Sequence, residues 1–368
     1  MDQSRLSLLA LHFIPGLGDH LIRQLVSYCG SAGNVFRTPK GKLLRIPGIG
    51  QKTAGLIATG KAFEAAEHEL ERCERENVNL VFFTDPVYPN RLRAVDDAPT
   101  LLYVKGSMNL DHQKIVGIVG TRRATNYGRQ CIEELVAGLI PLQAMIVSGL
   151  AYGIDILAHK QALECNLPTI GILGSGVDVI YPSAHADVAR KMEANGGIVS
   201  EQPLGTKPDG HNFPARNRII AGLSDALVVV EAGETGGALI TAAIANSYNK
   251  DVFAFPGNIG QSYSYGCNHL IKTNKANLIT SSADLEYMMN WNQEHATPAK
   301  PSLSLDGYPE EEQKVLVTLL ENGGTLVIDE LSWKSSYPVA RLASILLSLE
   351  FRGAVQSLPG KLYRLSRK

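Results

Sequence analysis

A short apolar strand that stops at a glycine-rich turn and passes into a helix recurs through the middle of this chain. It occurs as KIVGIVGTRRATNYG from residue 114, as MIVSGLAYGID from residue 145 and as TIGILGSGVD from residue 169. A fourth copy, SDALVVVEAGETGGALIT, begins at residue 224. Short Val/Ile-rich strands alternating with helices predict a parallel sheet covered on both faces. The sequence therefore predicts an α/β fold with an extended Rossmann-like parallel sheet core over residues 80–290.

The apolar runs place the elements of this core. Strands are expected near residues 114–120, 143–148, 168–173, 226–231, 251–255 and 277–280. Helices are expected near residues 127–140, 153–165, 184–195 and 235–249.

The glycine turns predict a site for a phosphate-bearing ligand. Glycine lets the backbone approach a ligand closely, and the helix that follows offers free N–H groups and a partial positive charge. In a parallel sheet these turns gather at one edge, so they form a crevice for anions. The turn residues concerned are Gly120, Ser148, Gly149, Gly153, Gly174, Gly176, Gly236 and Gly237.

Two basic clusters accompany the turns. Arg122 and Arg123 follow the first turn, and of these we expect Arg122 to face the crevice; the alternative is that both cap a carboxylate at the sheet edge. Arg216, Asn217 and Arg218 form the second cluster and are expected to precede a helix. A guanidinium group binds phosphate with two hydrogen bonds and stacks on bases. The alternative for the second cluster is an Arg–Asp pair that locks the loop.

Composition limits the class of protein. A chain of 368 residues exceeds one typical domain, and its net charge of −1 means that any nucleic-acid contact must come from local patches. Its five separated cysteines, without a CxxC pair, suit reduced thiols better than disulfides or zinc. We expect no signal peptide and no membrane span, and therefore a cytoplasmic protein.

Residues 1–79 are expected to form a helical domain with an internal repeat. Residues 14–18, IPGLG, recur as residues 46–50, IPGIG, and each copy lies between helical segments. The pattern resembles the helix-hairpin-helix motif (a SAM-like arrangement), which holds DNA phosphates. Gly48, Gly50 and Lys52 are therefore predicted as a secondary DNA contact, whereas Asp19 would repel phosphate at the first copy. The alternative is that both hairpins only pack a small helical bundle.

The C-terminal part is predicted to be a winged helix, residues 308–368, after a polar, proline-bearing linker at 291–307. The order expected is helix, short strand, helix, helix and hairpin. Arg341, Ser344 and Ser348 would lie on the outer face of the recognition segment. A single basic residue is little for reading a groove, so protein docking or weak DNA binding fits better.

The residues give little support for catalysis or metal binding. Ser148, Asp155 and His159 could be drawn as a hydrolase triad, but no GxSxG elbow is present. Cys267 and His269 lack a second pair at ligand spacing. We therefore expect no metal, no cofactor and no enzymatic activity. Stacking on bases is one role for Tyr248, Tyr263 and Tyr265, and burial is the other.

The motifs GIVGTRRAT, SGLAYGIDILAH, ILGSGVDVIYP, SEQPLG, FPARNRIIAGLSDALVVVEA, TGGALITA and FAFPGNI, in this order, resemble the DprA/Smf family of DNA-processing proteins. The resemblance implies a dimeric recombination mediator of natural transformation and homologous recombination. Such a protein binds and protects single-stranded DNA and helps to load the RecA recombinase over single-strand-binding protein. It also implies that Arg122 binds phosphate, and that Gly149, Gly174, Gly176 and residues 216–218 line the pocket.

One departure concerns Ser183, because many relatives have a lysine directly after the Tyr-Pro of the third motif. Lys191 or Lys207 could replace that lysine. The competing hypotheses are a LOG-type phosphoribohydrolase and a nucleotide sensor of the same superfamily. The hydrolases use a glutamate in PGGxGTxxE, whereas residues 238–241 here contain no carboxylate. The dimer surface, the recombinase surface, the role of the winged helix and the competence of the organism stay open.

Overall fold

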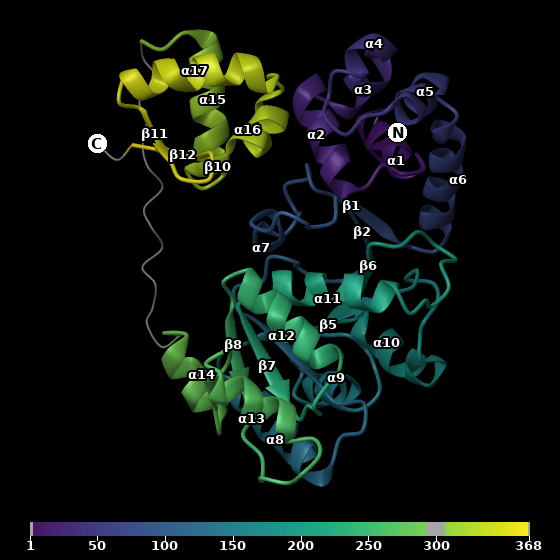
Figure 1. The fold of residues 1–368 in the computed structure, drawn as a ribbon, viewed down its shortest axis with the longest axis vertical. Helices are drawn as coiled ribbons and strands as arrows, with labels where there is room; N and C mark the ends of the chain where they lie inside the picture. The colour runs from purple at the N-terminus through teal and green to yellow at the C-terminus, as the bar shows by residue number, and fades with distance from the viewer. Residues whose placement is uncertain (1–2, 292–304, 306, 367–368) are drawn as a thin grey trace. The chain divides into compact units, whose positions relative to one another are not determined.

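The computed structural model describes residues 3–291, 305 and 307–366. The chain forms two compact units, one of residues 1–68 with 295–368 and the other of residues 69–294. Of the predicted linker at 291–307, residues 292–304 and 306 lie outside the described part of the chain. Figure 1 shows the ribbon of both units.

The larger unit is built on one nine-stranded sheet of order β1-β2-β6-β5-β4-β3-β7-β8-β9. Its strands are β1 (Asn79–Phe82), β2 (Leu101–Ser107), β3 (Ile115–Gly120), β4 (Met145–Ser148), β5 (Thr169–Leu173), β6 (Gly196–Ser200), β7 (Ala226–Val230), β8 (Asp251–Ala254) and β9 (Asn277–Leu278). Strands β3 to β9 pair in parallel, and β1 and β2 extend the sheet in the antiparallel sense. The predicted parallel α/β core is confirmed.

Strand β6 is absent from the sequence prediction because it opens with two glycines. A Cβ on Gly196 would lie 2.0 Å from the carbonyl oxygen of Thr169, and one on Gly197 would lie 2.1 Å from that of Lys105. The glycines therefore let β6 fit between β5 and β2.

Helices cover both faces of this sheet. They are α7 (Asn90–Arg93), α8 (Asn126–Gly138), α9 (Ile154–Glu164), α10 (Ala186–Met192), α11 (Asn212–Leu223), α12 (Gly237–Ser247), α13 (Tyr265–Lys272) and α14 (Ser282–Met288), with a short 3-10 turn, η1 (Ser183–His185). The apolar sides of α8 and α9 pack on the face that carries Val116, Ile118 and Ile146. In Figure 1, α11 and α12 cross in front of the strands. Residues 216–218 lie inside α11, so the expectation that they precede a helix is wrong.

The smaller unit begins with short helices. They are α1 (Gln3–His12), α2 (Asp19–Cys29), α3 (Ala32–Arg37), α4 (Lys40–Leu43) and α5 (Gln51–Thr59). Helix α6 (Ala62–Arg75) follows, and its residues from Glu69 on belong to the larger unit. The predicted repeat is visible in the backbone, because Gly16 and Gly48 both have a φ of 81°. Each ends a tight turn in a conformation that favours glycine.

The C-terminal part of this unit has the predicted element order. It comprises α15 (Glu310–Glu321), β10 (Thr325–Val327), α16 (Ile328–Ser335), α17 (Val339–Phe351), β11 (Val355–Leu358) and β12 (Leu362–Leu365), with a sheet of order β10-β12-β11. Leucine, isoleucine and valine side chains from all three helices form its core. None of the helices in the described part of the chain has the length and hydropathy needed to cross a bilayer.

Candidate nucleic-acid interface

The turns that follow β3, β4 and β7 meet at one edge of the sheet. Gly120 ends β3, and a Cβ on it would lie 2.0 Å from the Val230 carbonyl oxygen and 2.5 Å from Ile154 Cγ1. Only glycine allows β7 and α9 to approach this closely. The backbone N–H of Thr121 donates to the carbonyl oxygen of Glu231 at 2.7 Å. The first turn is therefore held against its neighbours on both sides.

Arg122 lies directly over the start of α9. Gly153 has a φ of +78°, and a Cβ on it would lie 2.2 Å from Thr121 O and 2.6 Å from Arg122 C. Arg122 and Arg123 are both exposed. The guanidinium carbon of Arg122 lies 6.0 Å from the centroid of the Phe213 ring, within range of a cation–π contact. A fixed backbone thus presents an exposed cation beside an aromatic ring.

A second aromatic ring adjoins this pair. The rings of Phe213 and Tyr181 have centroids 5.9 Å apart and an interplanar angle of 37°, and Tyr181 is exposed. Arginine and aromatic rings together suit a phosphate and a base. Sequence reasoning did not select either ring, although Tyr181 follows the third glycine turn and Phe213 begins the FPARNR motif.

Arg216 lies against the Gly149 turn and is only 6% exposed. Its Nη1 donates to the carbonyl oxygen of Gly149 at 2.7 Å and also to that of Ile172. The backbone N–H of Gly149 donates to Asp155 Oδ2 at 3.1 Å. This arrangement corrects the expectation that Arg216 lines the pocket, because its guanidinium is directed at the backbone that supports the turn.

Asp155 is buried like Arg216, with 7% of its surface exposed. Burial lowers the pKa of Arg216 to about 10, and the charge of Asp155 opposes that shift. Burial also raises the pKa of Asp155, and Arg216 opposes this in turn. Each charge therefore stabilises the other next to the Gly149 turn. This agrees with the alternative given for the second basic cluster, in which an arginine and an aspartate together lock the loop.

The other members of the second basic cluster also have partners. Asn217 is buried, and its Nδ2 lies 3.5 Å from the carbonyl oxygen of Gly237. Arg218 forms an ion pair with Glu201. Gly236 and Gly237 are exposed, and a Cβ on Gly236 would meet no atom within 4 Å. The α12 N-terminus is thus open to a ligand, whereas the arginine cluster holds the loops.

The third turn divides between the crevice and a neighbouring loop. A Cβ on Gly174 would lie 3.3 Å from Phe213 Cδ1, so this glycine lies against the crevice ring. The backbone N–H of Gly176 donates to Thr206 O at 3.0 Å, so Gly176 packs into the loop after β6. Ser183 is exposed at the start of η1, and Lys207 is exposed in the loop that contains Thr206.

The serine and the histidine of the rejected triad each bond to a partner outside it. Ser148 is buried and donates from Oγ to the carbonyl oxygen of Ile118 at 2.5 Å. The Nδ1 atom of His159 lies 2.7 Å from Thr169 Oγ1, in a wholly buried setting. Neither the hydroxyl nor the imidazole is exposed at the crevice.

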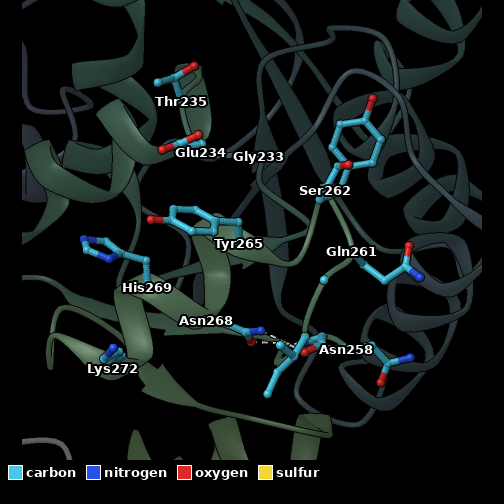
Figure 2. A pocket seen from close by; sticks show the side chains of 14 residues that line it. Gly233, Glu234, Thr235, Asn258, Gln261, Ser262, Tyr265, Asn268, His269 and Lys272 are labelled. Carbon is cyan, nitrogen blue, oxygen red and sulfur yellow. Dashed lines mark hydrogen bonds between the residues drawn. The ribbon is translucent and has the colours of Figure 1, made fainter.

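A separate hollow of about 1000 Å³ lies between the start of α13 and the loops after β7 and β8. Figure 2 shows its lining, in which Tyr265 and His269 project from α13 with rings 6.2 Å apart and nearly parallel, at 3°. Cys267 is buried, and the described residues hold no cluster of three potential metal ligands.

The Tyr248 hydroxyl donates to Asp97, so this ring is held by the protein itself.

The remaining predicted residues belong to the smaller unit. Gly48, Gly50 and Lys52 are exposed. In the winged helix, Arg341 forms an ion pair with Glu311 at 2.6 Å, and Ser348 Oγ donates to Glu312 at 2.7 Å. Ser344 is exposed. These bonds join α17 to α15 and leave few polar groups for groove contacts.

Solved structures resemble this fold. The X-ray structure of DNA processing protein A (DprA) from Streptococcus pneumoniae aligns with a TM-score of 0.69 and 34% identity, over 78% of this chain and 98% of that one. The second, of DNA processing protein A from Helicobacter pylori, has a title that describes its single-stranded DNA binding mode. It aligns with a TM-score of 0.53 and 30% identity, over 58% of this chain and 96% of that one.

Sequence comparison agrees. Protein Smf of Synechocystis sp. is 38% identical over 283 residues, which is 75% of this chain and 70% of that protein. The DprA winged helix domain model matches residues 294–361. The model described as DNA recombination-mediator protein A matches residues 79–290. The chain therefore belongs to the DNA recombination-mediator protein A family.

Proposed function

We propose that this chain binds single-stranded DNA at the crevice formed by Arg122, Phe213 and the glycine turns, and that it acts as a recombination mediator. The observation that carries the proposal is the exposed Arg122 guanidinium held 6.0 Å from the Phe213 ring at the carboxyl edge of the sheet. The guanidinium binds a phosphate, and bases stack on the rings of Phe213 and Tyr181.

A single strand fits this arrangement better than a duplex. Base faces in a duplex are already stacked on each other, whereas those of a single strand are free to stack on protein rings. The similarity to the Helicobacter pylori protein, whose title names single-stranded DNA binding, supports the same ligand class here.

The mediator role includes partners. We propose that the chain forms a homodimer that presents two crevices to one strand, protects that strand, and helps to load RecA where single-strand-binding protein is bound. No cofactor is required in this role. All five cysteines are free thiols, which suits action in the reducing cytoplasm.

Two assays test the proposal. In the first, labelled oligonucleotides of increasing length are titrated, and affinity is expected to rise with length. In the second, RecA filament formation is followed on a strand coated with single-strand-binding protein, and the chain is expected to accelerate it. A response that is independent of length, together with saturable mononucleotide binding or release of free base, would contradict the proposal and favour the hydrolase or the sensor.

A further inference from the structure

Positive charge is concentrated in one part of the smaller unit. Residues 20–63 contain seven lysines and arginines and no aspartate or glutamate, although the whole chain is nearly neutral. Six of the seven are exposed, and within the described residues these six form no ion pair: Arg37, Lys40, Lys42, Arg45, Lys52 and Lys61. A patch of one sign with no internal counter-charge attracts a polyanion.

Several of these cations surround the second hairpin, residues 44–50. Lys40 and Lys42 lie on α4, Arg45 lies in the hairpin, and Lys52 is the second residue of α5. The Lys40 ammonium lies 3.9 Å from where a Cβ on Gly55 would be, so it reaches over α5. No side chain caps the α5 N-terminus, so its first N–H groups add partial positive charge to the same surface.

The first hairpin has the same backbone conformation as the second, but its side chains carry different charges. Gly18 and Gly50 precede their helices with φ, ψ of −84°, 172° and −89°, 172°. Asp19 then occupies the first position of α2, where α5 has Gln51, and His20 stands in the place of Lys52. Since the backbones match, the two hairpins differ in charge, and only the second has a charge that favours anion binding.

The patch offers cations and N–H groups but no ring for a base. Residues 37–61 contain no aromatic side chain. The nearest rings on either side, Phe36 and Phe63, pack on each other with centroids 4.6 Å apart. Proteins that hold single strands combine cations with stacking rings, whereas the backbone of a duplex presents regularly spaced phosphates with its bases enclosed.

We propose that the surface formed by Lys40, Lys42, Arg45 and Lys52 around the second hairpin docks the phosphate backbone of duplex DNA without reading its sequence. This surface is separate from the Arg122 crevice and does not depend on the function proposed for that crevice. A chain with both sites can bind a single strand and a duplex.

The test compares two triple variants of the full chain on a labelled blunt-ended duplex. Lys42→Gln/Arg45→Gln/Lys52→Gln removes three cations from the patch. Lys160→Gln/Arg190→Gln/Lys275→Gln removes three exposed cations from the larger unit and serves as the control of equal charge. The patch variant is expected to lose at least about tenfold in duplex affinity. The slope of log affinity against log salt concentration is expected to become shallower by about 2–3, since each phosphate contact contributes about 0.9 to that slope. The control is expected to stay within about twofold of the parent.

Single-strand affinity separates this inference from the proposed function. The patch variant is expected to retain it, and Arg122→Ala is expected to lose it while keeping duplex binding. Unchanged duplex affinity in the patch variant, or equal losses in both triple variants, would overturn the inference. So would a parent chain that binds vesicles of anionic phospholipid but no duplex at low salt. Equal thermal unfolding of all variants, expected because the changed side chains are exposed, checks the fold.

Discussion

The Nη1 atom of Arg216 donates to the carbonyl oxygen of Gly149 at 2.7 Å, while the N–H of the same glycine donates to Asp155. The Gly149 turn is therefore held by two buried side chains of opposite charge, one bonded to its carbonyl oxygen and the other to its N–H. A Cβ on Gly149 would lie 2.5 Å from Nη1, so the turn and the guanidinium are closely fitted. We therefore expect ligand binding to depend on Arg122 and stability to depend on Arg216.

Replacing Arg216 with methionine is expected to destabilise the fold by about 3–5 kcal/mol, because it leaves Asp155 buried without its counter-charge. Urea unfolding measures the loss. Arg216→Met combined with Asp155→Asn is expected to cost less than the sum of the single changes, since the two side chains interact. Additive costs, or an unchanged unfolding free energy in Arg216→Met, would show that the pair does not lock the turn.

Substitutions of Arg122 and Phe213 are expected to weaken single-strand binding in different ways. Arg122→Ala removes a charge-assisted phosphate contact worth about 1–3 kcal/mol. It also makes the slope of log affinity against log salt concentration shallower by about 0.7. Phe213→Ala removes stacking of about 1–3 kcal/mol and leaves the salt dependence unchanged. Titrations at several salt concentrations distinguish the two. Lys160→Ala, an exposed cation on α9, is the control and should behave as the parent. Identical salt slopes for the two variants would refute this division.

Gly153→Ala is expected to destabilise the fold by about 1–3 kcal/mol, because alanine is strained at a positive φ and its Cβ would meet Thr121 O. It should also displace Arg122 and weaken strand binding. Gly210→Ala, where nothing lies within 4 Å of the added Cβ, is the matched control. Equal stability and affinity of the two variants would show that the turn adapts freely.

Acidification is expected to destabilise the protein through His159. Burial, together with the charge of Arg216, lowers the pKa of this imidazole to about 3, whereas the unfolded chain has a histidine pKa near 6.5. Between these values the unfolded state binds one more proton, so the unfolding free energy falls by about 1.4 kcal/mol per pH unit as the pH falls. Urea unfolding across this range measures the slope.

His159→Gln should remove this contribution to the slope. His12 has a pKa lowered to about 4, mainly by burial and against the charge of Asp19, so it contributes a slope of the same sign that His12→Gln removes. A pH dependence that is unchanged in His159→Gln would contradict the assignment.

The strands and turns of the core could be predicted because apolar runs ending in glycine have few alternatives. The direction of a side chain could not. The segment FPARNR contains Phe213 and Arg216, three residues apart, yet the ring lies beside Arg122 and the guanidinium lies under the sheet edge. The packing of α11 against α12 and against β3, β4 and β5 separates these roles. From the sequence, Arg216 was expected to contact the ligand, because a charged residue is rarely buried without a partner. Its partner, Asp155, lies 61 positions earlier in the chain, so the sequence does not reveal that the two side chains meet.

The most direct test of the crevice is a fluorescence anisotropy titration of one long labelled single strand with the parent and with Arg122→Ala, at low and at moderate salt. The account predicts tight, salt-sensitive binding by the parent and a weaker, less salt-sensitive binding by the variant, with equal thermal stability. Equal affinity of the two proteins at low salt would contradict it and place the strand elsewhere on the chain.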